Sequence, residues 1–97
     1  MIIVTGSAQV RAGQLEEALR LSLEHVHRSR TEPGCLLHSV HRDVEGPERL
    51  VFLEHWADLD ALRAHFAVPE SRAFSKALAA LAEHASIEIY DATPVRP

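Results

Sequence analysis

Strand-like and helix-like segments alternate along the 97-residue chain in an order that few folds can accommodate. Residues 2–10 are rich in β-branched side chains and contain no proline, which indicates a strand. Between residues 15 and 26, apolar side chains recur at three- and four-residue steps, with charged side chains between them. This pattern predicts an amphipathic helix that ends near Glu32-Pro33-Gly34, because proline and glycine do not continue a helix.

The middle of the chain predicts a hairpin. Residues 35–44 and 49–56 are both strand-like, and the short polar turn between them contains Gly46 and Pro47. Two strand-like runs this close together can only pair with each other in an antiparallel sense.

The length of the hairpin loop decides which side chains face each other. A five-residue loop pairs Asp43 with Arg49. His38 then lies opposite Glu54, whereas a four-residue loop places it opposite His55. The strand pattern is compatible with both registers.

The second half of the chain predicts a broken helix pair and a last strand. Asp58 can cap a helix at its N-terminus, and Pro69 opens a further helical stretch that runs to Glu83. Residues 86–93 alternate in part between apolar and polar side chains, which predicts the strand. Because the sequence shows no internal repeat and no linker, we expect one domain over residues 1–97.

The order of these segments is β-α-β-β-α-β. It predicts an α+β fold of the ferredoxin-like, split βαβ type, in which helices cover one face of a four-stranded antiparallel sheet. The other face then lacks a cover, and a domain of this size buries only about 60–65% of its unfolded-chain surface. A sheet from a second copy could cover that face, so we expect a homodimer.

Composition excludes several classes of function. The formal net charge is −4 and no run of like charges exceeds two residues, so the chain lacks the basic surface that nucleic-acid binding requires. We expect no membrane contact, because there is no apolar stretch of about 18 residues and no secretory leader. The single cysteine cannot form an internal disulfide. These features are typical of a cytoplasmic protein.

Seven histidines raise the question of a metal site, and their spacing argues against one. His25 and His27 lie two residues apart on the predicted helix, roughly 200° apart around its axis. His38 and His41 lie three apart on a strand and face opposite sides of the sheet. The sequence has no HExxH or CxxC motif. We therefore expect no intrachain metal site, and we predict that His25, His27 and His84 are solvated.

Nucleophilic chemistry has little support in the sequence. Cys35 begins a strand after Pro-Gly and has no base pattern beside it, so we expect a small buried filler. There is no GxSxG motif, glycine-rich phosphate loop or paired-carboxylate signature, which argues against acyl and phosphoryl transfer.

One group of side chains predicts a pocket. Phe52, Glu54 and Trp56 share one face of a predicted strand, which places a carboxylate between two aromatic rings. His65 lies beside the apolar stripe of the following helix. If that helix packs on this strand face, the imidazole, the indole and the carboxylate converge at the edge of an apolar pocket. The alternative is ordinary core packing, with Glu54 paired to an arginine such as Arg72.

Five segments of the chain, taken together, form a recognisable sequence pattern. They are Glu32-Pro33-Gly34-Cys35-Leu36, Val40-His41-Arg42-Asp43, Phe52-Leu53-Glu54-His55-Trp56, Ala61-Leu62-Arg63-Ala64-His65-Phe66 and Ser71-Arg72-Ala73-Phe74. In this order and spacing the chain resembles the antibiotic biosynthesis monooxygenase family, which includes small quinol monooxygenases. The resemblance runs nearly from end to end.

The resemblance implies a ferredoxin-like protomer that pairs through its sheet into a dimeric α+β barrel, with a pocket between sheet and helices. Family members with known activity use dioxygen to oxygenate electron-rich aromatic substrates, such as quinols, anthrones and related polyketides. They need neither flavin nor metal, so no cofactor is expected. Trp56, Glu54 and His65 match the family's pocket positions and are the expected catalytic residues. The expected substrate-binding residues are His38, Phe52, Phe66 and Phe74.

The family also bears on the hairpin register and on the chemistry. Members often carry a tyrosine on the pocket side where this chain has His38, which favours the five-residue loop. A quinol or anthrone anion can give an electron directly to dioxygen, so the protein has to deprotonate the substrate and exclude water. His65 is the expected base, with His38 as the alternative. Trp56 is expected to form a stacking wall, and Glu54 to orient a histidine or an arginine.

Other functions stay open at this point. The fold also serves non-catalytic small-molecule-binding dimers, and similar barrels carry isomerase or decarboxylase chemistry on small cyclic acids. The haem-degrading branch of the fold resembles the chain less well. It has a tryptophan where His65 stands, a haem-ligating histidine near Ser75 and an asparagine on the first strand, where this chain has only Ser7 or Gln9 nearby.

Overall fold

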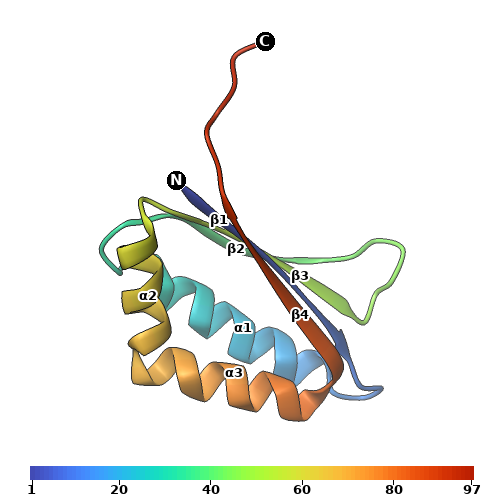
Figure 1. Ribbon diagram of the computed structural model, residues 1–97. Helices are drawn as coiled ribbons and strands as arrows, with labels where there is room; N and C mark the ends of the chain where they lie inside the picture. The colour runs from blue at the N-terminus through green and yellow to red at the C-terminus, as the bar shows by residue number, and fades with distance from the viewer.

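Seven elements make up the computed structural model, which describes residues 1–97 (Figure 1). In chain order they are β1 (Ile2–Val10), α1 (Leu15–Ser29), β2 (Cys35–Arg42), β3 (Arg49–Trp56), α2 (Leu59–Ala67), α3 (Pro69–Leu81) and β4 (Ala82–Asp91). The predicted β-α-β-β-α-β order is confirmed, with the second helix broken into α2 and α3. The four strands form one antiparallel sheet in the order β2-β3-β1-β4, and all three helices lie on one of its faces. The ferredoxin-like fold is therefore confirmed.

The hairpin between β2 and β3 has the five-residue loop. The Asp43 N–H donates to the Arg49 carbonyl at 3.0 Å, and His38 pairs with Glu54 in the ladder. The register shifts between Cys35 and Leu37, where an irregularity marks the start of β2. This register places His38 on the helix-covered face, beside Glu54.

Local chemistry explains where the helices begin. The Asp58 carboxylate accepts a hydrogen bond from the Ala61 N–H at 2.8 Å, so it caps α2 as predicted. Val68 has an extended conformation between α2 and α3, and Pro69 occupies the first turn of α3. The break is thus set by proline, whose ring cannot continue α2.

The boundary between the last helix and the last strand differs from the prediction. The helix was expected to run to residue 83 and the strand to span 86–93, whereas α3 ends at Leu81 and β4 begins at Ala82. Ala82 is buried and pairs with Val10 beyond a register shift that leaves Glu83 of β4 unpaired, and the Arg11 N–H donates to the Leu81 carbonyl at 2.9 Å. Pairing with β1 extends the strand beyond what its local sequence indicates.

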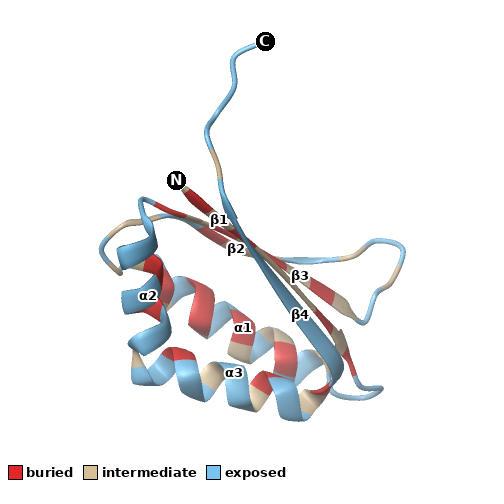
Figure 2. Ribbon diagram, in the orientation of Figure 1, coloured by how far each residue is buried: buried red, intermediate tan, exposed pale blue.

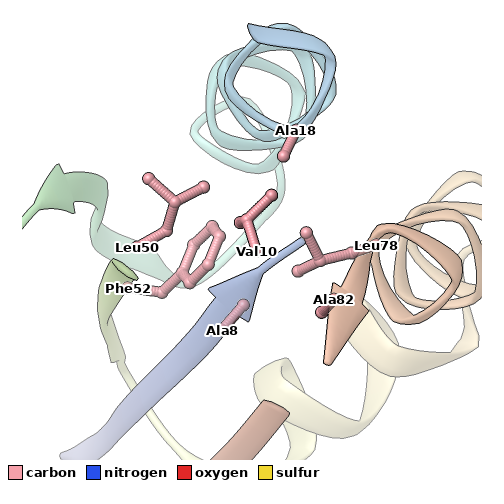
Figure 3. Close-up of a cluster of buried hydrophobic side chains, with 7 residues drawn as sticks. All are labelled: Ala8, Val10, Ala18, Leu50, Phe52, Leu78 and Ala82. Carbon is pink, nitrogen blue, oxygen red and sulfur yellow. The ribbon is translucent and has the colours of Figure 1, made fainter. Parts of the chain in front are cut away.

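Two clusters of buried apolar side chains join the helices to the sheet. Figure 2 marks the buried positions of the helices and of β1 and β3 in red. The larger consists of Ala8, Val10, Ala18, Leu50, Phe52, Leu78 and Ala82 (Figure 3). The smaller consists of Ile2, Val4, Trp56 and Leu62. Through the larger cluster Ala18 of α1 is joined to Ala8 and Val10 of β1. None of the three helices is long and apolar enough to cross a membrane.

Gly34 brings the loop before β2 against α2. Its φ is +82°, and a Cβ at this position would lie 2.5 Å from the Ala61 Cβ. Only glycine combines this conformation with so close an approach. The contact fixes the position of the helix that carries His65.

The face of the sheet opposite the helices has no cover. Side chains that alternate with the buried ones point to this face, and several are apolar and partly or fully exposed: Ile3, Leu37, Val51, Leu53 and Tyr90. The homodimer that this face suggested stays a prediction.

Candidate functional site

A cavity of about 310 Å³ lies between the sheet and the helices. Its apolar wall comes chiefly from Phe52, Phe66, Phe74, Leu78 and Ile87. Its polar residues include His25, Glu54 and His65. The outer part of the wall contains exposed residues of α3 and β4, so the cavity opens to solvent between these two elements. A mostly apolar hollow with a few convergent polar groups is the usual form of a small-molecule site.

Glu54 lies at the centre of the polar group. Its Oε1 accepts a hydrogen bond from the Trp56 indole N–H at 2.9 Å and lies 3.4 Å from His38 Nε2 and 3.9 Å from His65 Nε2. Burial raises the pKa of the Glu54 carboxyl, but contact with the His38 imidazole and the Trp56 N–H outweighs burial and leaves this pKa below its usual value. Glu54 is therefore a carboxylate at neutral pH.

Arg72 is not the partner of Glu54. Its guanidinium is exposed, and its Nε donates to the Phe66 carbonyl at 3.4 Å. The Glu54–Arg72 pair of the core-packing alternative is therefore wrong, whereas Phe52 and Trp56 do belong to buried apolar clusters, as that alternative expected. The negative charge of Glu54 faces imidazoles and an indole instead.

His65 is buried on the inner side of α2 and has a different partner at each ring nitrogen. Nδ1 lies 2.8 Å from Glu32 Oε1, and Nε2 faces Glu54. Because a carboxylate only accepts hydrogen bonds, this contact places the proton on Nδ1 and leaves the Nε2 lone pair free. The Trp56 ring packs against the imidazole at a centroid distance of 4.5 Å. The ring is thus held by packing on one side and by Glu32 on the other.

Glu32 is a site residue that the sequence analysis missed. It sits in the Glu32-Pro33-Gly34 turn, where the sequence indicates a helix end and a segment of the family resemblance but no role for this side chain. It also borders a second hollow on the surface. His65 borders both this hollow and the main cavity. The sequence around the turn carries no local signal for the contact between Glu32 and His65, because these residues lie 33 positions apart.

His25 is not solvated, so that prediction is wrong. It is buried on α1, and its ring stacks on Phe74 at a centroid distance of 4.0 Å and an interplanar angle of 8°. The Arg28 guanidinium donates to His25 Nδ1 at 2.7 Å. Burial, together with the neighbouring His38, His65 and Arg28, lowers the pKa of His25 to about 3. His25 is therefore neutral at physiological pH.

A sequence signal for His25 did exist. It follows Ala18 and Ser22 and precedes Ser29 along the buried stripe of α1 at three- and four-residue steps. A polar residue on such a stripe has to find a partner or a function. The other two histidines named with it, His27 and His84, are exposed as predicted.

His38 completes a cluster of three imidazoles from three elements. It is 2% exposed, its Nδ1 has no hydrogen-bond partner, and its Nε2 has only the 3.4 Å contact with Glu54 Oε1. The ring centroids of His25, His38 and His65 are 5.2 to 5.5 Å apart. Spacing along the sequence could not show this cluster, because each member comes from a different element.

The structure separates the seven proposed site residues into two groups. Five of them, Glu54, His65, Phe52, Phe66 and Phe74, line the cavity. Trp56 and His38 do not, and both are fully buried next to Glu54. The expectation that Trp56 stacks on a substrate does not fit this position. Its indole instead packs on His65 and holds Glu54.

Cys35 is half-buried and packs against the smaller apolar cluster. Burial raises the pKa of its thiol, and the nearby Glu32 and Glu54 carboxylates raise it further. Cys35 is therefore poorly suited to act as a nucleophile.

Comparison with known proteins identifies a family and an uncharacterized relative of the chain. The model of the antibiotic biosynthesis monooxygenase family matches residues 1–77. An uncharacterized protein of Synechocystis sp. is 36% identical over 90 residues, which are 92% of this chain and 61% of that protein. The chain thus spans about three fifths of that relative's length.

Solved structures agree with this assignment. A proposed antibiotic biosynthesis monooxygenase from Deinococcus radiodurans is 28% identical, with a TM-score of 0.94 over 100% of this chain and 97% of that one. A conserved protein from Methanosarcina mazei is 27% identical, with a TM-score of 0.87 over 92% of this chain and 89% of that one.

Proposed function

The chain belongs to the antibiotic biosynthesis monooxygenase family, and we propose that it is a cofactor-independent monooxygenase acting on an electron-rich aromatic substrate such as a quinol. The cavity volume of about 310 Å³ lies at the lower end of the range typical of small-molecule sites, about 300–1,000 Å³. A small phenolic ring fits the aromatic wall of the cavity. The substrate is therefore expected to be a compact phenol rather than a long or charged molecule.

The observation that carries this proposal is the setting of His65. Its Nδ1 is held by Glu32, its Nε2 faces Glu54, and both His65 and Glu54 line an apolar cavity. A neutral imidazole with its tautomer fixed by a carboxylate can accept a phenolic proton. Glu32 is a positioning residue in this scheme, because it acts through His65.

Glu54 stabilises the charge that this proton transfer creates. Once Nε2 is protonated, His65 is an imidazolium between two carboxylates, Glu32 at 2.8 Å from Nδ1 and Glu54 at 3.9 Å from Nε2. Trp56 holds the Glu54 oxygen in place through its 2.9 Å hydrogen bond. Both carboxylates therefore favour the protonated base and assist ionisation of the substrate.

The substrate anion supplies the electrons for the reaction with dioxygen. The anion passes one electron to dioxygen, and recombination of the two radicals forms a carbon–oxygen bond. Overall the substrate loses two hydrogen atoms and gains one oxygen atom, while the second oxygen atom leaves as water. The apolar wall around Phe52 and Phe74 keeps bulk water away from these intermediates.

We further propose that the active form is a homodimer. The uncovered face carries Ile3, Val51 and Leu53 at its centre, and none of them is fully buried in the single chain. A second sheet packed on this face removes apolar surface from water, which stabilises the pair by about 25 cal/mol per Å² of apolar surface.

Oxygen uptake with a panel of quinols and other phenols tests the proposed activity. We expect the wild type to consume dioxygen with at least one member of the panel, and we expect His65→Ala to lose this activity. His27→Ala is the matched control, because His27 is exposed on α1 and touches neither the cavity nor the imidazole cluster. Full activity of His65→Ala would remove His65 from the mechanism. Binding of phenols without oxygen uptake would indicate a non-catalytic binding protein.

A further inference from the structure

We propose that His25, His38 and His65 form a binding site for a divalent transition-metal ion such as Zn²⁺, and that an ion bound there blocks His65 as a base. The site goes beyond the proposed function, since binding of the ion does not depend on turnover. Neither the spacing of the histidines nor the family predicts it. It follows from how the three elements α1, β2 and α2 meet.

The geometry of the three imidazoles suits one ion. Each residue offers a ring nitrogen, and the three nitrogens lie within 4.8 Å of one another. Some point is therefore within about 2.8 Å of all three, compared with a Zn–N bond length of about 2.0–2.1 Å. Shifts of less than about 1 Å in each side chain, within the range of small rotations of the imidazole rings, bring the nitrogens to bonding distance.

Two of the three imidazoles are already prepared as ligands. Glu32 fixes the Nδ1–H tautomer of His65, so the Nε2 lone pair is available, and a carboxylate behind a metal-binding histidine is a common supporting contact. His38 is 2% exposed, its Nδ1 has no partner, and its Nε2 has only Glu54 Oε1 at 3.4 Å, without good hydrogen-bond geometry. A buried unpartnered imidazole is costly in free energy. Coordination of a metal ion by a ring nitrogen of His38 would give this imidazole the polar partner that it lacks.

The charges around the cluster favour a cation. Glu54 Oε1 lies 3.4 Å from His38 Nε2 and 3.9 Å from His65 Nε2, so it can approach the ion as a fourth ligand. Glu32 adds a second negative charge behind His65. The cation in contact with an imidazole of the cluster is Arg28, at His25 Nδ1, whereas Arg30 donates to the main-chain carbonyl of His38. Both carboxylates lie at imidazole nitrogens, where an ion would bind, and so does one guanidinium.

Arg28 is the competing contact. Its Nη2 donates to His25 Nδ1 at 2.7 Å and to Ser71 Oγ at 3.2 Å. When His25 coordinates an ion through one nitrogen, the other carries the proton and can no longer accept from Arg28. Arg28 keeps Ser71 as a partner, so the guanidinium is not left without a hydrogen bond.

The chemistry of the ligands selects the ion. Imidazole nitrogens suit Zn²⁺, Cu²⁺, Ni²⁺ and Co²⁺, whereas Mg²⁺ and Ca²⁺ prefer oxygen ligands. Because His25, Glu54 and His65 also line the cavity, an ion bound to them faces the substrate space. It uses the Nε2 lone pair of His65, which can then no longer accept a proton.

Titration of untagged, chelator-treated protein with ZnCl₂ in a calorimeter tests the site. We expect one Zn²⁺ per chain, and we expect His38→Ala and His25→Ala each to weaken binding at least about 100-fold. His27→Ala, from the exposed side of α1, is expected to bind like the wild type. Equal affinities of His38→Ala and wild type would overturn the proposal, as would the absence of saturable binding in the wild type.

X-ray absorption at the zinc edge needs no variant and so does not depend on how the variants fold. We expect three imidazole nitrogens at about 2.0 Å in the wild-type complex. A zinc shell of oxygen atoms, or of fewer than three imidazoles, would overturn the proposal.

Oxygen uptake separates the site from the proposed function. If the chain oxidises a quinol, one equivalent of Zn²⁺ is expected to stop turnover and a chelator to restore it. Full turnover with zinc held by three imidazoles would overturn the blocking of His65. A chain that binds zinc in this way but consumes no oxygen with any quinol or other phenol of the panel would refute the proposed monooxygenase and leave the metal site standing.

Discussion

Acidification is expected to destabilise the fold through His25. Its pKa is about 3 in the native state, against 6.5 for the free side chain. Between these values the unfolded chain binds a proton at His25 and the native chain does not. The free energy of unfolding therefore falls as the pH drops below 6.5, by about 1.4 kcal/mol per pH unit, and this loss ends near the native pKa. At pH 5 the contribution is about 2 kcal/mol.

Urea unfolding at pH 7 and pH 5 in the presence of a chelator measures this contribution. His25→Gln is the matched variant, because glutamine can still accept from Arg28 but does not titrate. Other groups change the pH dependence of both proteins alike, so the comparison isolates His25. We expect the wild type to lose about 2 kcal/mol more than the variant between the two pH values. Equal losses in the two proteins would refute the buried, neutral state of His25.

Three further predictions concern the loop, the base and the uncovered face. Gly34→Ala is expected to lower the free energy of urea unfolding by about 2–4 kcal/mol, because its φ is positive and the new Cβ clashes with α2. Gly13 has a similar φ but open space around it, so Gly13→Ala is expected to cost about 1 kcal/mol. Equal costs would contradict the close approach of Gly34 to Ala61. Glu32→Gln is expected to lower kcat for quinol oxidation about 10-fold and leave KM nearly unchanged, since it acts through His65, and an unchanged kcat would argue against this role. Leu53→Glu is expected to give monomers in light scattering, because it buries a charge in the proposed interface; persistent dimers would place the interface elsewhere.

The sequence was informative wherever the decisive interactions are local. The strand, helix and turn signals gave the segment order, and Asp58 and Pro69 marked the starts of α2 and α3 because capping and the proline ring act within a few residues. The hairpin register needed the family resemblance, since the strand pattern allowed both parities. His38 then came to lie beside Glu54, as the five-residue loop requires.

Long-range contacts account for what the sequence did not reveal. The start of β4 depends on its pairing with β1, which is more than 70 residues earlier in the chain. The alternation of apolar and polar residues within β4 was too weak to show where the strand begins. Glu32 contacts His65 because the turn at Gly34 packs closely against Ala61 of α2. The histidine cluster joins three elements, and tests of spacing within one element could not detect it.

The central claim is that His65 deprotonates a phenol bound in the cavity, and absorption spectroscopy of a bound chromophore tests it most directly. The ligand is a phenol whose ionised form absorbs at a distinct wavelength, bound without oxygen and in the presence of a chelator, at a pH below its own pKa. The wild type is predicted to bind it as the phenolate, and His65→Ala as the neutral phenol. A neutral phenol in both proteins, or a phenolate in both, would contradict the account.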